Sequence, residues 1–394
     1  MTAYRPVHPF PARMAPDLAV QKVARMSRKK AVVLDPMMGS GTFPLVAALH
    51  GHRAYGLDSD PLAVLIAQAA SSCVDADEAL GAAEIAVNTA RKVRKSPLRF
   101  DPETKKFVEY WFDAKTASEL GCLASVISKS PIHLRPVFWC AFSRLIITKD
   151  AGASLARDVS HSRPHRTRDV GAFSPLDRFS QATSVVLQRR AVTSWERSNT
   201  TAPGKSFNVH LLRGDARRIP LADRSVDAVM TSPPYLVAID YLRGHRMSLV
   251  WMGHSIGELR QLRATNVGSE RGLDRRGKTS HIVDAVTTPS MSPRTRRVVN
   301  NYVTALGLVV DEMARVLKRS GLLTMVISDA KMEGQEISVE QIVVGLARDA
   351  NLSVQEREVR LLPPDRRYLP PPKDGAQSAL RKRMRQETVL LLAR

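Results

Sequence analysis

Residues 33–43 (VLDPMMGSGTF) decide the fold class. The apolar run 31–34 (AVVL) predicts a short buried strand that ends at Asp35. The glycines of the turn 39–41 leave no side chain between backbone and ligand, and residues 42–50 carry apolar side chains at helical spacing. The backbone amides of such a turn can face a carboxylate or phosphate at the start of a helix.

The next segment repeats this pattern. Residues 53–57 predict a second strand that ends at Asp58, and residues 61–71 (PLAVLIAQAAS) predict a helix with proline in its first turn. Strand, helix, strand and helix in so short a span indicate a parallel α/β sheet with helices on both faces. The same alternation of strands and helices returns over residues 208–392. We expect strands over 208–212, 225–230, 322–327, 353–361 and 386–392, and helices over 303–317 and 339–350, with Gly321 ending the first of these helices.

Two insertions interrupt the pattern. Residues 77–93, 115–129 and 135–147 have helical character, whereas the Arg-rich stretches 154–198 and 254–297 show little periodicity. We therefore divide the chain into a cofactor-binding half (1–74), a helical, Arg-rich insertion (75–205) and a catalytic half (206–394) with a basic loop at 254–297.

Composition narrows the class of partner. The 394 residues include 59 Lys and Arg against 38 Asp and Glu, for a net charge of +21. A surplus of this size indicates a polyanionic partner, with nucleic acid first and an anionic membrane surface second. No apolar run is long enough to span a membrane, and the start lacks the pattern of a signal peptide. Cys73, Cys122 and Cys140 have no metal-binding spacing, so we expect reduced core cysteines in a cytoplasmic protein and no metal site.

Asp58 is the first candidate binding residue outside the glycine turn. It ends the second strand about 20 residues after the turn begins, where a carboxylate can accept hydrogen bonds from both hydroxyls of a ribose. The alternative is a cap for the following helix, for which Asp60 is better placed.

Three segments resemble the amino-directed DNA methyltransferases, the N4-cytosine and N6-adenine enzymes. DPMMGSGT (35–42) with GLDSDPLA (56–63) is similar to their motifs I and II, HPFPARMAPDLA (8–19) to motif X, and TSPPYLVAIDY (231–241) to the catalytic motif IV. The resemblance implies a class I S-adenosylmethionine-dependent methyltransferase fold, a Rossmann-like sheet with S-adenosylmethionine as cofactor. The cofactor-binding residues that it implies are His8, Pro9, Phe10, Asp35, Met38, Gly39, Gly41, Thr42, Asp58 and Asp215.

The catalytic residues that it implies are Ser232, Pro233, Pro234 and Tyr235. The amino group of a base is a poor nucleophile, because its lone pair is delocalised into the ring. Two prolines stiffen the loop, so that the Ser232 hydroxyl and the Pro233 carbonyl can accept hydrogen bonds from the amine and aim it at the methyl group. Tyr235 offers a face for a base that has left the duplex.

Further candidates surround these motifs. Asp215 follows the predicted strand 208–212, where this fold presents a polar group to the adenine of the cofactor. Asp240 and Tyr241, with Arg243, His245 and Arg246 on a predicted helix, form either a wall of the site or a phosphate contact, or else simple helix surface.

The resemblance favours a DNA methyltransferase of the N4-cytosine type with double-stranded DNA as its partner, acting in restriction–modification or phage defence, with a cognate restriction endonuclease as a further partner. The alternatives are an N6-adenine enzyme, an RNA methyltransferase of the tRNA guanine-N2 type, and an inactive nucleic-acid-binding protein. The Arg-rich candidates for DNA recognition are residues 157–197, 271–278 with 294–297, and 363–373 with 381–385.

Overall fold

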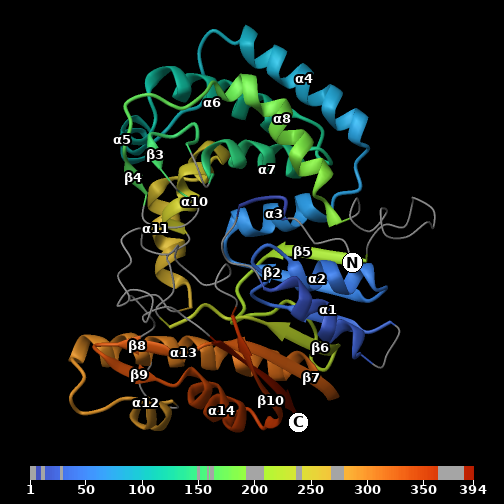
Figure 1. Ribbon diagram of the computed structural model, residues 1–394, viewed down its shortest axis with the longest axis vertical. Coiled ribbons are helices and arrows are strands. Elements are labelled where there is room, and N and C mark those ends of the chain that lie inside the picture. The colour runs from blue at the N-terminus through green and yellow to red at the C-terminus, as the bar shows by residue number, and fades with distance from the viewer. Residues whose placement is uncertain are drawn as a thin grey trace.

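The computed structural model describes residues 6–9, 14–26, 30–148, 151–157, 159, 164–191, 208–236, 242–267, 279–362 and 386–394. Within them a seven-stranded sheet forms the centre of the lower part of the molecule (Figure 1). Its strands, in spatial order, are β10 (Ser353–Leu361), β11 (Gln386–Ala393), β7 (Leu317–Ile327), β6 (Val226–Thr231), β1 (Val32–Asp35), β2 (Arg53–Asp58) and β5 (Val209–Arg213).

The strand order confirms the expected fold class. β5, β2, β1, β6 and β7 are the third, second, first, fourth and fifth strands of this sheet along the chain, which is the order of a doubly wound fold. These five strands are parallel, and β11 runs antiparallel between β7 and β10. The sheet is that of a class I methyltransferase.

Helices cover both faces of the sheet. One face packs against α1 (Pro16–Ala24), α2 (Thr42–Leu49) and α3 (Pro61–Ser71). The other packs against α12 (Ser280–Val286), α13 (Pro293–Val316) and α14 (Val339–Asp349). Val33 faces the first group and Leu34 the second, as the alternation of side chains along a strand requires.

The insertion is a helical layer above the sheet (Figure 1). It holds α4 (Ala76–Lys92), α5 (Pro102–Trp111), α6 (Ala114–Lys129), α7 (Arg135–Ile146) and α8 (Pro175–Gln188), and α10 (Leu242–Leu249), η1 (Val250–Met252) and α11 (Ile256–Thr265) join it. Leu62, Ala63 and Ile66 of α3 belong to the core of this layer, whereas Val64 and Ala67 of the same helix pack toward the sheet. The shared helix α3 therefore joins the helical layer to the sheet.

Several sequence-based expectations were wrong. The stretch 154–198 contains α8 and the two-residue strands β3 (Ala156–Arg157) and β4 (His165–Arg166), and α5 was missed. The stretch 254–297 contains α11, α12 and the start of α13. The side chains of Ser174, Ser255 and Ser292 cap α8, α11 and α13, so a serine marks where each of these helices begins.

Gly321 does not end a helix. It lies inside β7, which follows α13 without a loop, and a Cβ there would come within 2.7 Å of the Leu317 side chain and 3.0 Å of the Asp227 carbonyl oxygen. Glycine is needed at position 321 because a residue with a side chain could not approach these atoms so closely. Cys73 is exposed, which corrects its expected place in the core, while Cys122 and Cys140 are buried free thiols.

Candidate active site

Most of the predicted site residues that the structure describes lie at one edge of the sheet. β1, β2, β5 and β6 are parallel, so their carboxyl ends share an edge. From β1 the chain order runs outward to β2 and β5 on one side and to β6 and β7 on the other. In open α/β sheets ligands bind outside the carboxyl ends of the strands, at this reversal of order.

The glycine turn lies on this edge, after β1. Gly39 and Gly41 have φ of 53° and 79°, the left-handed region that favours glycine. A Cβ on Gly41 would lie 2.7 Å from that of Ala67, so the turn also needs the space. The Ser40 and Thr42 hydroxyl oxygens are buried and have no hydrogen-bond partner within the described parts of the chain. Buried polar groups are rarely left unpaired, so these two hydroxyls indicate a site for a polar ligand.

Asp58 ends β2 beside the turn. Its Oδ2 accepts a hydrogen bond from the Gly39 amide at 2.8 Å, and its Oδ1 accepts one from the Asp60 amide at 2.9 Å. Burial, and then the negative charge of Asp60, raise the pKa of Asp58 to about 7. Asp58 thus holds the glycine turn and presents a carboxylate at the point where the sequence predicts ribose binding.

Asp35 has a different role from the other predicted cofactor residues. It is 2% exposed, and its Oδ1 accepts hydrogen bonds from the Met37 amide at 3.1 Å and the Thr231 hydroxyl at 2.8 Å. Burial raises its pKa to about 7. Asp35 therefore joins the end of β1 to the end of β6 and fixes the glycine turn relative to the Ser232 loop.

Met38 packs toward the sheet, whereas His8 of motif X contacts the helical layer. Met38 packs between β2, β5 and α3, because Gly56 leaves room for its sulfur. His8 is buried, with its Nε2 3.0 Å from the Ser143 hydroxyl of α7, and Pro9 is partly exposed. Phe10 lies outside the described residues. The segment 6–9 is thus anchored to the helical layer.

Asp215 lies after β5, on the same edge. Arg217 donates to both of its carboxylate oxygens, with Nη2 2.6 Å from Oδ2 and Nε 2.9 Å from Oδ1. Burial acts in the opposite direction, but the hydrogen bonds from Arg217 hold the pKa of Asp215 below its usual value. This ionised side chain is 48% exposed, so it remains accessible to a ligand.

The four predicted catalytic residues follow β6 directly. Pro233 is buried, and Ser232, Pro234 and Tyr235 are partly exposed. The Tyr235 hydroxyl donates to Glu387 Oε1 at 3.1 Å. Glu387 is the second residue of β11, and burial raises its pKa although Tyr235 and Arg360 oppose the shift. Sequence reasoning missed Glu387, because the contact spans 152 positions and no local pattern marks it.

A buried pair links the helix after this loop to the cofactor side. His245 of α10 is 3% exposed, and its Nδ1 lies 2.5 Å from Asp60 Oδ2. Asp60 also caps α3 by accepting from the Leu62 amide at 2.9 Å, as the sequence indicated. His245 is therefore neither helix surface nor a phosphate contact. Asp240 and Tyr241 lie outside the described residues.

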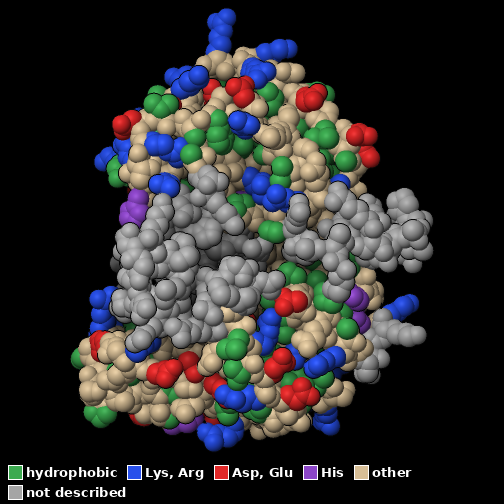
Figure 2. Space-filling model, in the orientation of Figure 1, with side chains coloured by type: hydrophobic (Ala, Val, Ile, Leu, Met, Phe, Trp, Pro, Cys, Tyr) green, Lys and Arg blue, Asp and Glu red, His purple; other side chains and the backbone are tan. Residues whose placement is uncertain are grey.

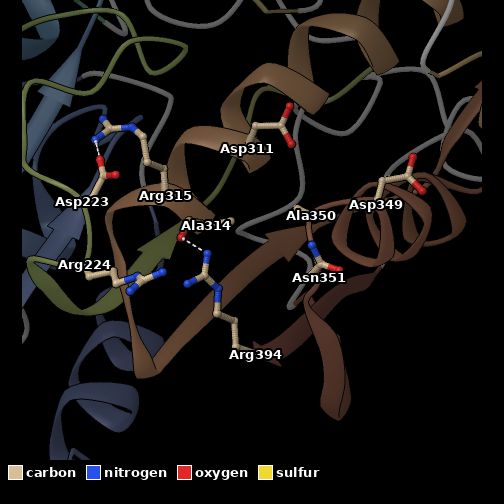
Figure 3. Close-up of a pocket in the computed structure, with 9 residues that line it drawn as sticks. All are labelled: Asp223, Arg224, Asp311, Ala314, Arg315, Asp349, Ala350, Asn351 and Arg394. Atoms are coloured by element: carbon tan, nitrogen blue, oxygen red, sulfur yellow. Dashed lines mark hydrogen bonds and ion pairs between the residues drawn. The ribbon is translucent and has the colours of Figure 1, made fainter.

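The pocket shown in Figure 3 lies at the opposite, amino-terminal edge of the sheet. Its volume is about 330 Å³, and Arg224, Arg315 and Arg394 line it together with Asp223, Asp311 and Asp349. None of the predicted site residues lines it. In the part of the chain that the structure describes, no three or more His, Cys, Asp or Glu side chains are grouped to bind a metal ion. Among the described helices, none is long and apolar enough to cross a membrane.

Comparisons with known proteins give a distant relative in sequence. No family model matches the chain. A curated relative, the type II methyltransferase M.MvaI of Kocuria varians, is 21% identical over 391 residues, which cover 88% of this chain and 81% of the relative. The chain has the fold of an S-adenosylmethionine-dependent methyltransferase.

Solved structures similar to this methyltransferase fold include a TehB-like SAM-dependent methyltransferase of Corynebacterium glutamicum, with 7% identity, a TM-score of 0.31 and coverage of 95% of this chain and 86% of that one. The rRNA methyltransferase AviRa of Streptomyces viridochromogenes has 12% identity, a TM-score of 0.30 and coverage of 97% and 85%.

S-adenosylmethionine is the cofactor of this fold, and the residues present fit it. The glycine turn and the unpaired Ser40 and Thr42 hydroxyls suit the polar methionine end, and Asp58 suits the ribose hydroxyls. The cofactor supplies an electrophilic methyl group.

Proposed function

We propose that this protein transfers a methyl group from S-adenosylmethionine to the exocyclic amine of a base flipped out of double-stranded DNA, with cytosine N4 as the target. One observation carries the proposal. The segment Ser232, Pro233, Pro234 and Tyr235 ends β6 at the reversal of strand order, and the Asp35–Thr231 hydrogen bond joins it to the glycine turn.

The local chemistry supports an amine as the nucleophile. Ser232 and the Pro233 carbonyl supply acceptors for amino hydrogens, and the Tyr235 ring, whose hydroxyl is held by Glu387, supplies a stacking face. A cysteine nucleophile, which methylation at cytosine C5 would need, is absent from the described part of this edge. Cys122 and Cys140 are buried in the helical layer, and Cys73 follows α3 at the end remote from Asp58.

The charge and the sequence relative support DNA as the substrate. The net charge of +21 favours a polyanion. The relative is a type II methyltransferase by name, which supports a place in restriction–modification with a cognate endonuclease as partner. RNA methyltransferases of the tRNA guanine-N2 type usually have Asp or Asn before the two prolines, where this chain has Ser232.

Methyl transfer to defined nucleic acids tests the proposal. The purified protein is incubated with tritium-labelled S-adenosylmethionine and a mixed-sequence DNA duplex, a matching RNA duplex, or transfer RNA. We expect label in DNA only, and N4-methylcytosine after digestion to nucleosides. N6-methyladenine would keep the mechanism and change the base, and label confined to RNA would contradict the proposal. No transfer to any substrate would favour an inactive nucleic-acid-binding protein.

A further inference from the structure

A small β-ribbon in the helical layer exposes an arginine and a histidine. β3 and β4 are antiparallel, with Ala156 opposite Arg166 and Arg157 opposite His165. Directly opposed residues share a face of the ribbon. Ala156 is 1% exposed, whereas Arg157 and His165 are both exposed. Arg157 and His165 therefore form one outward-facing pair.

The neighbouring arginines hold the ribbon in place. The Arg166 guanidinium lies over the ring of Tyr110 on α5, 5.6 Å from its centre, and also pairs with Asp169 at 3.3 Å. Arg168 Nη2 donates to the carbonyl oxygens of Ser154 and Ala156 at 3.2 and 2.8 Å. In contrast, no ion-pair partner of Arg157 or His165 occurs in the described ranges. The structural contacts thus use Arg166 and Arg168 and leave the outward pair available.

The ribbon stands next to the helix that follows the catalytic loop. A Cβ on Gly244 of α10 would lie 2.8 Å from the Val159 carbonyl oxygen, so α10 and the ribbon segment touch backbone to backbone. Two residues further along α10, the Arg246 guanidinium lies 5.0 Å from the ring centre of Phe107 on α5. The ribbon, α5 and α10 therefore pack together, and α10 begins seven residues after Tyr235.

Arg157 and His165 lie side by side on the outward face, and Arg157 has no carboxylate partner within the described residues. Lys and Arg side chains are scattered over the helical layer in the view of Figure 2, with Asp and Glu among them. A two-stranded ribbon fits the major groove of DNA, and Arg and His can both donate to phosphates or base edges. We propose that the face of the ribbon that carries Arg157 and His165 binds the DNA duplex beside the flipped base. This inference rests on the proposed function.

Charge reversal with a matched control tests it. The variants are Arg157→Glu, the double variant Arg157→Glu with His165→Glu, and Lys129→Glu. Lys129 is exposed and ends α6, about 24 Å along that helix from its start. The start of α6 lies near the ribbon, since Asp113 there accepts from the Gly171 amide. Affinity for a fluorescent duplex of about two helical turns is measured by anisotropy at several salt concentrations, with cofactor binding by calorimetry as the test of folding.

We expect Arg157→Glu to weaken duplex binding roughly 10-fold or more, because a charge-assisted hydrogen bond to the DNA is removed. The slope of log affinity against log salt should fall by about 0.9 for each phosphate that the variant no longer neutralises. The double variant should bind more weakly still, and Lys129→Glu should stay within about threefold of the original protein because of screening. Cofactor affinity should be unchanged in all three.

The outcomes separate this inference from the proposed function. If the original protein binds and methylates the duplex while both ribbon variants match Lys129→Glu, the ribbon is not the DNA-binding surface and the proposed function stands. If the original protein neither binds nor methylates the duplex, the proposed function fails and this inference fails with it. Equal weakening in the ribbon and Lys129 variants would indicate general attraction and also contradict the ribbon proposal.

Discussion

Asp35 and Asp58, which are buried at the carboxyl edge of the central sheet, differ from the arginine-paired carboxylates at its amino edge and from the exposed Asp215, which pairs with Arg217. At the carboxyl edge, burial raises the pKa of Asp35 and of Asp58 to about 7, and neither forms an ion pair with Lys or Arg within the described residues. At the amino edge, Arg315 donates to Glu312 at 2.7 Å and holds the pKa of Glu312 below its usual value. Arg315 also pairs with Asp223 at 2.7 Å (Figure 3).

This difference between carboxylates distinguishes those that can bind a ligand from those that stabilise the fold. Carboxylates that are paired with arginine favour the folded state, whereas burying one without a cation works against it. Groups with such perturbed pKa values collect at functional sites. We therefore assign ligand binding to the carboxyl edge and a stabilising role to the pocket at the amino edge.

The largest effect is expected at the glycine turn. Gly41→Val adds a Cβ that would meet Ala67 and forces a branched side chain to φ 79°, at a cost of about 3 kcal/mol or more. Cofactor binding measured by calorimetry should be abolished. Gly51→Ala is the control, because its φ is 86° but no atom lies within 4 Å of the new Cβ. Unchanged affinity in Gly41→Val would remove the turn from the site.

Asp58 should give the next largest effect. Asp58→Ala should weaken cofactor binding by about 1–3 kcal/mol, through loss of charge-assisted hydrogen bonds to the ribose. In the original protein the affinity should also fall as the pH drops through 7, because the protonated carboxyl is a poorer acceptor. This pH dependence should flatten in Asp58→Asn. Calorimetry at several pH values around 7 measures the cofactor affinity of the original protein and of both variants. If the original protein and Asp58→Asn had the same pH profile, Asp58 would be excluded as the ribose ligand.

The pKa of Asp58 has a second consequence, for stability without cofactor. Its folded value of about 7 lies above the reference value of 3.8. The contribution of Asp58 to stability is therefore fully present below about pH 4 and is lost as the pH rises through 7. Thermal unfolding of the cofactor-free protein should show this loss, and Asp58→Asn should reduce it.

Replacing Arg315 should lower the stability of the fold and leave cofactor binding unchanged. Arg315→Ala removes hydrogen bonds to Glu312, Asp223 and the Ile219 and Leu221 carbonyls, and should lower the free energy of unfolding by about 1–3 kcal/mol. Cofactor affinity should not change. Arg319→Ala, at an exposed position of β7, is the control. A loss of cofactor affinity in Arg315→Ala would break the division between the two edges.

The smallest effect is expected at the Tyr235 hydroxyl. Tyr235→Phe keeps the ring and removes the hydrogen bond to Glu387, so capture of the flipped base should weaken by about 1 kcal/mol. Tyr235→Ala should cost about 1–3 kcal/mol, because the base no longer stacks on the ring. Steady-state KM for the duplex measures both. Equal values for the two variants would show that the ring does not hold the base.

The carboxyl edge was predictable from sequence where its signals are local. The strands β1 and β2, the glycine turn and the helix α3 follow from short apolar runs that are bounded by Asp35-Pro36, by the glycines of the turn and by Asp60-Pro61. The contacts of Glu387 with Tyr235 and of His245 with Asp60 span 152 and 185 positions, so only the folded chain reveals them. Helix α8 was missed and α13 was shortened because both begin in stretches whose overall composition is rich in arginine, although Ser-Pro pairs mark where they begin.

Single-turnover methylation by Ser232→Ala tests the central claim most directly. The reaction uses saturating S-adenosylmethionine and a DNA duplex that the original protein methylates. The control is Ser225→Ala, just before the amino end of β6 and so at the opposite edge of the sheet. We expect Ser232→Ala to be slower by about 10²–10³-fold with unchanged cofactor affinity, and Ser225→Ala to react at the original rate. Methylation by Ser232→Ala at the original rate would show that this loop is a structural turn and would contradict the catalytic assignment.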